Sequence, residues 1–475
     1  MISIFNIEND ILEVYSPETD EIRRARYDEL DRIISKDDFA IIYDSFNFYL
    51  KSGLSNNVID IKFIINSLCE HDDLSELYDQ YYDGGCSSNA IILYKLYDVY
   101  LSNGAYDFIK SKHELYVPII KSFAHTVRSG CLSIDYELFN HEKTKMEYEL
   151  DSIVTRISKY VDYKINISSL LDLEHWLCNT LNISYDSYSR SDLKKPFISK
   201  SLCKLENKYN VVQDILKCRD LKRDIRIIDN IIENDDHVSF QHADSTHIGI
   251  TLNLKNFDDI ISKDFVPFKR MDGYNIFKIS IVDPELYTLF KWCMEDRFSK
   301  CYECGKSLNA ILASMLNIDA NVFPLFLDSV FSREENPVNI YRLKCLGYDY
   351  NLCLNRLLGI QSVHAFVERA SKYQIKNKFL KSFNGSPVFI KQKIITRAER
   401  ARRILHIAGR LTPLENLYKL VGSIDKKYIN ILYINYEQIV LASKLCIQEI
   451  EELFSPAFLE STYPFVYNFE IKQIS

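Results

Sequence analysis

Apolar residues recur at three- and four-residue intervals along most of the chain up to about residue 233, and this spacing constrains the fold most strongly. Such a period places apolar side chains on one face of an α-helix. Ser16 is an expected N-cap before a proline, and Gly53 and Gly104 follow apolar segments, where glycine commonly ends a helix. Both of these segments end in the pattern Tyr-Leu-x-x-Gly, which suggests repeat-like hairpins. The sequence therefore predicts an N-terminal helical region over residues 1–135 and a central helical region over residues 136–235.

The period changes between residues 236 and 283. Apolar and polar residues alternate over 247–254, which is typical of a strand. The Asp-Gly pair at 272–273 separates two further apolar segments and predicts the turn of a hairpin. The Asp-Pro pair at 283–284 then predicts the start of a helix, so residues 284–475 are expected to form a C-terminal helical region. The predicted fold is mainly α and multi-lobed, with a small antiparallel β insertion around 236–283.

Composition places the chain among ordinary globular proteins, with 47% hydrophobic and 26% charged residues. No apolar run reaches the length of about twenty residues that a spanning helix needs, and the start lacks the pattern of a signal peptide. The 12 Cys are scattered without a dense disulfide framework. We therefore expect a cytoplasmic protein with no membrane span. Heavy use of Ile, Asn, Lys, Asp and Tyr is common in AT-rich genomes, which include bacterial genomic islands.

Charge is distributed unevenly along the chain. Of its 58 basic residues, twelve lie between Arg369 and Arg410, whereas only one of its 66 acidic residues, Glu399, lies there. This basic segment, residues 369–410, carries +11, and the rest of the chain carries −19. Because Lys and Arg neutralise phosphates and release counterions, nucleic acid or another polyanion is the leading expected ligand.

The basic segment is expected to form a helix, a turn, a strand and a second helix, each with its apolar residues on one face and cations outward. The pattern Thr396-x-x-Glu399 predicts a capping box at the start of the second helix. Aromatic Tyr373, Phe379 and Phe389 would add stacking to a single-stranded ligand. Two other roles for the cations remain open. They would pair with acidic residues in the rest of the chain or in a protein partner, or they would bind an anionic membrane surface. The candidate nucleic-acid-binding residues are Arg369, Lys372, Lys376, Lys391, Lys393, Arg397, Arg400, Arg402, Arg403 and Arg410.

A Cys pair resembles the first half of a C₂H₂ zinc finger, in which two Cys on a turn are followed by two His on a helix. The pair is Cys301 and Cys304, but Asn317 and Asn321 stand where the two His would follow. Cys293, Cys345 or Cys353 would complete a different site of four thiolates, but buried or free thiols are the simpler interpretation, so no metal site is predicted. The Gly-Lys-Ser that follows Cys304 lacks the upstream glycine of a phosphate-binding loop.

Two further patterns involve histidine. His237, His242 and His247 lie near three aspartates, but a spacing of five suits one face of neither a helix nor a strand, so a solvated turn is the simpler interpretation. Arg400 and His406 match the loose spacing of HEPN-type ribonucleases, a resemblance that implies phosphate binding by Arg and proton transfer by His. This pattern is short and Arg-rich, so no catalytic residue, metal or cofactor is predicted.

The leading expectation is a non-enzymatic accessory protein that binds nucleic acid or another polyanion through the basic segment, in a bacterial defence or mobile-element system. The alternative is a protein-interaction or effector protein whose N-terminal helices contact a partner. The third possibility is a metal-dependent or HEPN-like nuclease.

Overall fold

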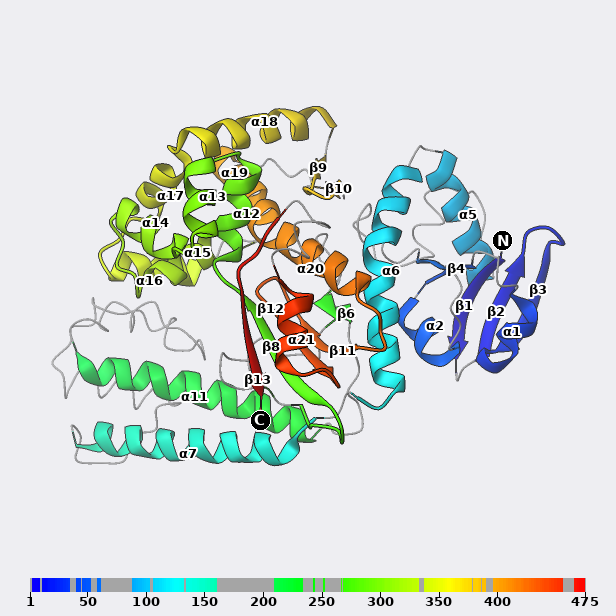
Figure 1. Ribbon diagram of the computed structural model, residues 1–475, viewed down its shortest axis with the longest axis horizontal. Helices are drawn as coiled ribbons and strands as arrows, with labels where there is room; N and C mark the ends of the chain where they lie inside the picture. Colours follow the sequence, from blue (N-terminus) through cyan, green and yellow to red (C-terminus); the bar gives the residue numbers. More distant parts are fainter. Residues whose placement is uncertain are drawn as a thin grey trace, which may run out of the picture.

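The structure is a computed structural model that describes residues 2–8, 11–34, 40–43, 45–52, 58–60, 88–102, 106–131, 134–159, 209–233, 242–243, 251–252, 266, 268–332, 337–377, 379–385, 387–389, 396–455 and 465–474. Helices dominate these residues, which confirms the mainly α prediction. A sheet lies at the N-terminal end, a second sheet lies centrally, and helices gather beside the second sheet (Figure 1). No described helix is both long and apolar enough to span a bilayer.

The chain begins with a five-stranded sheet of order β3-β2-β1-β4-β5. Neighbours among β1, β2 and β3 are antiparallel, whereas β4 runs parallel to β1 and β5 runs parallel to β4. Helix α5 packs on β1, and α2 packs on α6. The element bounds are β1 Ile2–Glu8, β2 Ile11–Ser16, β3 Glu21–Arg26, β4 Ala40–Ile42, β5 Val58–Asp60, the 3-10 turn η1 Tyr27–Glu29, α1 Leu30–Ile33, α2 Ser45–Ser52, α5 Asn89–Ser102 and α6 Tyr106–Arg128.

The strands β1, β2 and β3 occupy residues that were predicted to be helical. The expected N-terminal helical region over residues 1–135 is therefore wrong at its start. Ser16 ends β2 rather than capping a helix, and a turn with Asp20 at φ 54° leads into β3. Strand β3 lies at the sheet edge, where only Ala25 of its six residues is buried. Because most residues of this edge strand are charged, apolar and polar residues do not alternate along it as they do in a half-buried strand. Its two apolar residues, three positions apart, therefore resembled part of a helical pattern. The helices ending near Gly53 and Gly104 are present as α2 and α5, but both glycines lie outside the described residues, and the repeat stays a prediction.

Helices α7 (Tyr136–Ser158) and α11 (Asn210–Glu233) pack as an antiparallel pair. Ion pairs join opposite ends of the two helices: Lys143–Asp229 at 2.6 Å and Arg156–Asp214 at 2.7 Å. These helices confirm the helical character predicted for the start and end of the central region. The segment expected around residues 167–182 lies outside the described residues.

The second sheet has four strands in the order β11-β12-β8-β13, all antiparallel to their neighbours. The predicted turn at residues 272–273 is present, with Gly273 at φ 78°, and β8 (Asn275–Ile281) follows it. However, β8 pairs with β12 (Gln438–Ser443) and β13 (Phe469–Ile474) rather than with the segment before the turn. The β insertion is therefore not self-contained, and its best-formed strand is central to a sheet completed by the C-terminal region. The other strands are β6 His242–Ala243, β7 Thr251–Leu252 and β11 Ile429–Ile434.

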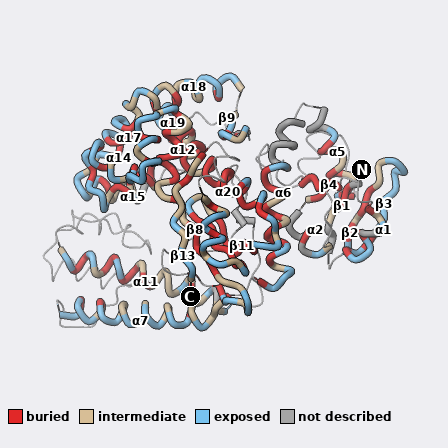
Figure 2. Tube along the Cα trace, in the orientation of Figure 1, coloured by how far each residue is buried: buried red, intermediate tan, exposed pale blue. Residues whose placement is uncertain are grey.

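The helices beside this sheet centre on α12, which begins at Pro284 as predicted and buries most of its residues (Figure 2). A long helical element crosses it, formed by α19, the π-helical turn η4 and α20. Thr396 caps α19 by accepting from the Glu399 amide at 3.1 Å, which confirms the first half of the predicted capping box, whereas the Glu399 carboxylate accepts from Arg403 at 2.8 Å. The bounds are α12 Pro284–Trp292, α13 Asp296–Glu303, α14 Leu308–Leu316, α15 Phe323–Phe331, α16 Pro337–Cys345, α17 Tyr350–Leu358, α18 Gln361–Asn377, β9 Phe379–Lys381, β10 Pro387–Phe389, α19 Arg397–His406, η4 Ile407–Leu411, α20 Thr412–Ser423 and α21 Ile447–Leu453.

One hydrophobic core runs through both sheets. It includes Ile4 of β1, Phe123 of α6, Phe290 of α12, Tyr418 of α20 and Ile279 of β8. Tyr116 of α6 and Tyr418 of α20 meet edge to face at 5.7 Å within it. The separate lobes expected from the sequence remain a prediction.

Candidate functional site

The first half of the basic segment presents cations on α18. Val363, Phe366 and Val367 are buried, as predicted for the apolar arc of this helix. Arg369, Lys372 and Lys376 are exposed, since steps of three and four residues bring them to one face. Lys381 of β9 is also exposed. None of these cations forms an ion pair with another described residue. The first half of the basic segment therefore agrees with the prediction that its cations face outward.

The second half of the basic segment is largely engaged by the protein itself. Arg402 is 7% exposed and donates to the Ser332 carbonyl at 3.1 Å. Arg403 donates to Glu399 at 2.8 Å, and Arg397, although exposed, donates to Glu368 at 2.6 Å.

The outward orientation expected for Arg402 is therefore wrong, because α19 packs on both α15 and α18 and buries more than one of its faces. Arg400 is half-buried, and Lys391 and Lys393 lie outside the described residues.

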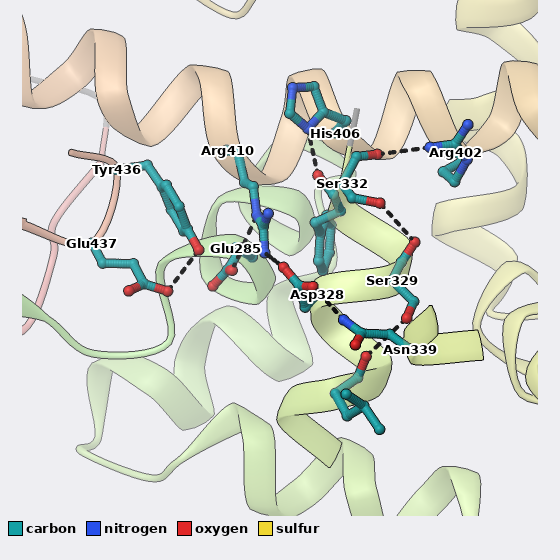
Figure 3. Close-up of polar contacts among 12 residues, drawn as sticks. Glu285, Asp328, Ser329, Ser332, Asn339, Arg402, His406, Arg410, Tyr436 and Glu437 are labelled. Carbon is teal, nitrogen blue, oxygen red and sulfur yellow. Dashed lines mark hydrogen bonds and ion pairs between the residues drawn. The ribbon is translucent and has the colours of Figure 1, made fainter. Parts of the chain in front are cut away.

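Arg410 contacts two carboxylates and one aromatic ring (Figure 3). Its Nη2 lies 2.9 Å from Oδ1 of Asp328, and its Nε lies 3.6 Å from Oε1 of Glu285. The guanidinium carbon also lies 4.8 Å from the centre of the Tyr436 ring. Burial lowers the pKa of Arg410, but Tyr436, Glu285 and Asp328 together raise it above its ordinary value. Arg410 therefore stays charged and corrects the prediction that it points outward.

Glu285 faces Arg410 from the first turn of α12. Burial and the nearby Glu437 raise the pKa of Glu285 to about 7, while Arg410 opposes this shift. The Arg410–Asp328 contact is the shorter of the two, so Arg410 is held mainly by Asp328. This leaves Glu285 only partly compensated and able to change protonation near neutral pH.

The π-helical turn η4 places Arg410 against α12. Gly409 lies within this turn, and a Cβ there would be 2.4 Å from a ring carbon of Phe331. Only glycine therefore allows the long helix to approach α15 this closely. His406 contacts the Phe331 carbonyl through Nδ1, so one of its ring nitrogens is engaged within the same packing contact.

A pocket of about 280 Å³ opens beside this cluster, where β8 leads into α12 and the β11–β12 turn approaches. Asp283 has a left-handed backbone with φ 45°, and its carboxylate accepts from Ser307 Oγ at 3.0 Å and the Asn309 amide at 3.1 Å. The pocket is lined by Lys278, Ser280, Ile281, Val282, Asp283, Pro284, Glu285, Asn309, Glu437, Gln438, Glu470 and Lys472.

Sequence reasoning did not find this pocket or the role of Glu285. One available signal was a carboxylate directly before the mostly apolar segment Leu286 to Phe290, because a charge at the start of a largely buried helix needs a partner. The partners Asp328 and Tyr436 come from other parts of the chain and had no local signal.

The Cys and Gly-Lys-Ser motifs connect two helices. Cys304 follows α13, Gly305 takes φ 75°, and Ser307 caps α14 by accepting from the Ala310 amide at 3.3 Å. Cys301 and Cys304 are free thiols. Within the described ranges, no group of three or more His, Cys, Asp or Glu is arranged to hold a metal ion. Of the three clustered histidines only His242 is described, in β6.

No protein-family model matches the sequence, and no curated protein matches it. Among solved structures, the chain resembles the POL domain of Pol1 from M. smegmatis, in a complex described as holding DNA primer-template and dNTP. The TM-score is 0.76 at 11% sequence identity, and the match covers 99% of this chain and 94% of the other. The chain therefore shares the fold of a DNA polymerase domain over nearly its whole length.

Proposed function

We propose that the protein binds nucleic acid of the primer–template class and does not catalyse nucleotide transfer. The observation that carries this proposal is the likeness, over nearly the whole chain, to a polymerase domain whose structure includes primer-template DNA. It agrees with the polyanion ligand expected from the charge of the basic segment.

The exposed cations of α18 supply the contact surface that we propose. Arg369, Lys372 and Lys376 follow one face of the helix, and Lys381 lies on the adjoining strand β9. Phosphate contacts of this kind set affinity and position without reading sequence. Four cations of α19 and η4 are excluded from this surface because other groups of the protein engage them: Arg397, Arg402, Arg403 and Arg410.

The Arg410 cluster supports the non-catalytic part of the proposal. Polymerases transfer nucleotides with two metal ions, and Mg²⁺ is usually held by one or two carboxylates together with substrate phosphates. Here Glu285 lies at the central sheet with the guanidinium of Arg410 3.6 Å away, and Asp283 accepts two hydrogen bonds from the α14 region. A divalent cation at Glu285 would compete with the guanidinium of Arg410 for the carboxylate, so we infer that Glu285 itself is not a metal ligand.

The direct test is fluorescence anisotropy with a labelled primer–template over a series of salt concentrations. The triple variant R369Q/K372Q/K376Q is expected to bind more weakly and to lose about 2.7 from the slope of log affinity against log salt, since each duplex phosphate contact contributes about 0.9. The matched control is R23Q/R24Q/R26Q, which removes three exposed cations from β3 at the opposite end of the molecule.

Equal losses in both triple variants would contradict the proposed surface. In a parallel assay, primer extension by the wild-type protein with Mg²⁺ and deoxynucleotides would contradict the non-catalytic part of the proposal.

A further inference from the structure

The turn between β9 and β10 carries an exposed aromatic ring. Phe383 is 40% exposed at this turn. On the neighbouring helix α18, Tyr373 is 38% exposed and packs edge to face against Phe379 of β9 at 5.8 Å. Scattered exposed apolar residues are ordinary, so this turn needs a further feature to indicate a ligand.

That feature is the way in which buried polar contacts fix the turn. Ser382 Oγ donates to Oε2 of Glu415 at 2.6 Å, and Asn384 donates to the same oxygen at 3.2 Å. Glu415 is fully buried in α20. The Phe383 ring itself rests edge-on against Trp292 at 5.7 Å and Phe465 at 4.6 Å. The exposure of Phe383 is therefore built into the fold, and a ligand stacking on it would pay little ordering entropy.

Exposed cations lie on the elements next to this ring. Lys381 precedes it in the hairpin, and Lys419 reaches the turn by donating to Asn384 Oδ1 at 2.6 Å. The exposed Lys372 and Lys376 lie on α18, which packs against β9. Aromatic faces combined with cations that follow a phosphate backbone are characteristic of surfaces that bind single-stranded nucleic acid. A base pair within a duplex already stacks on its neighbours, so its faces are not available to Phe383.

We propose that this surface, called here the turn platform and formed by Tyr373, Phe383, Lys372, Lys376 and Lys381, binds unpaired bases of single-stranded nucleic acid. Phe383 stacks on a base, and the lysines neutralise the adjoining phosphates. The inference rests on the proposed function and adds to it a preference for the unpaired part of a primer–template.

The test compares three labelled probes: a short oligo(dT), a blunt duplex, and the same duplex with an unpaired template overhang. Phe383→Leu and Tyr373→Leu are expected to weaken oligo(dT) binding about 5- to 150-fold each, which corresponds to losing one stacked base. Their affinity for the blunt duplex should be unchanged. Phe383→Tyr should retain wild-type binding, and Met315→Leu, which alters an exposed apolar residue of α14, should have no effect.

Because Phe383 also packs on Trp292, thermal unfolding checks that each variant is folded. In a second experiment, which needs no variant, the wild-type protein is crosslinked to a probe carrying iodouracil in the overhang. Crosslinks to peptides containing Tyr373 or Phe383 are expected. Crosslinks found only elsewhere, or equal loss of blunt-duplex and oligo(dT) binding in Phe383→Leu, would overturn the turn platform while leaving the proposed function standing. A wild-type protein that binds none of the three probes would overturn both.

Discussion

Replacing Arg410 with methionine tests the buried ion pair between Arg410 and Glu285. Methionine keeps much of the volume of the arginine stem and removes the guanidinium. The side chains of Arg410 and Glu285 are only 18% and 9% exposed, so the variant leaves a buried carboxylate without its counter-charge. Because Glu285 has a pKa of about 7 and can take up a proton instead, the loss at this carboxylate is limited to about 1.4 kcal/mol of the free energy of unfolding at about pH 8.

The cost should depend on pH because burial and Glu437 raise the pKa of Glu285 to about 7. At about pH 8 the wild-type carboxylate is ionised and interacts with Arg410, so the full cost is expected. At about pH 5.5 Glu285 is mostly protonated in both proteins, and the variant loses less. The difference between wild type and variant therefore widens as pH rises.

Urea unfolding measures this difference. In a Trp176→Phe background Trp292, at the end of α12, is the only tryptophan and reports on the region around Glu285. The matched control is Arg397→Met, whose arginine is 82% exposed in its pair with Glu368 and is worth at most about 1 kcal/mol. An equal cost for Arg410→Met at both pH values, or a cost at about pH 8 no larger than that of the control, would show that Arg410 does not stabilise ionised Glu285.

Because the pKa of Glu285 is raised in the folded state, the folded protein binds more protons than the unfolded protein between about pH 4.5 and about pH 7, and the free energy of unfolding falls as pH rises through this window. Urea unfolding of Glu285→Gln should show a weaker dependence of this free energy on pH, and an unchanged dependence would contradict the assignment to Glu285. Gly409→Ala should cost about 1–3 kcal/mol in urea unfolding because its Cβ meets the Phe331 ring, and the cost should shrink in a Phe331→Leu background; equal costs in both backgrounds would exclude that clash as the cause. Burial raises the pKa of Cys293 to about 12 and that of Cys218 to about 11, so alkylation followed by peptide mapping should label exposed Cys304 and Cys446 first, and early labelling of Cys293 would contradict its burial.

Features that depend on local sequence were predictable. The turn at Gly273, the start of α12 at Pro284, the cap at Thr396 and the buried arc of α18 each follow from a few neighbouring residues. Their physical causes, backbone dihedral preference, capping hydrogen bonds and helical periodicity, act within one or two turns of chain.

Features that depend on distant partners were not predictable. Strand β8 pairs with β12 and β13, which come from the far end of the sequence, and no local pattern specifies such pairing. Arg410 looked like one more outward cation because its partners, Glu285 and Asp328, lie far earlier in the chain. The excess of acid outside the basic segment did indicate that some of its cations would pair internally, and the structure identifies Arg397 and Arg410 among them.

We propose that the exposed cations of α18 bind nucleic acid, and the salt dependence of primer–template affinity measures this most directly. The wild-type protein is expected to lose affinity steeply as salt rises, and R369Q/K372Q/K376Q is expected to bind more weakly with a slope shallower by about 2.7. An affinity that is independent of salt, or a slope that the triple variant leaves unchanged, would contradict the account.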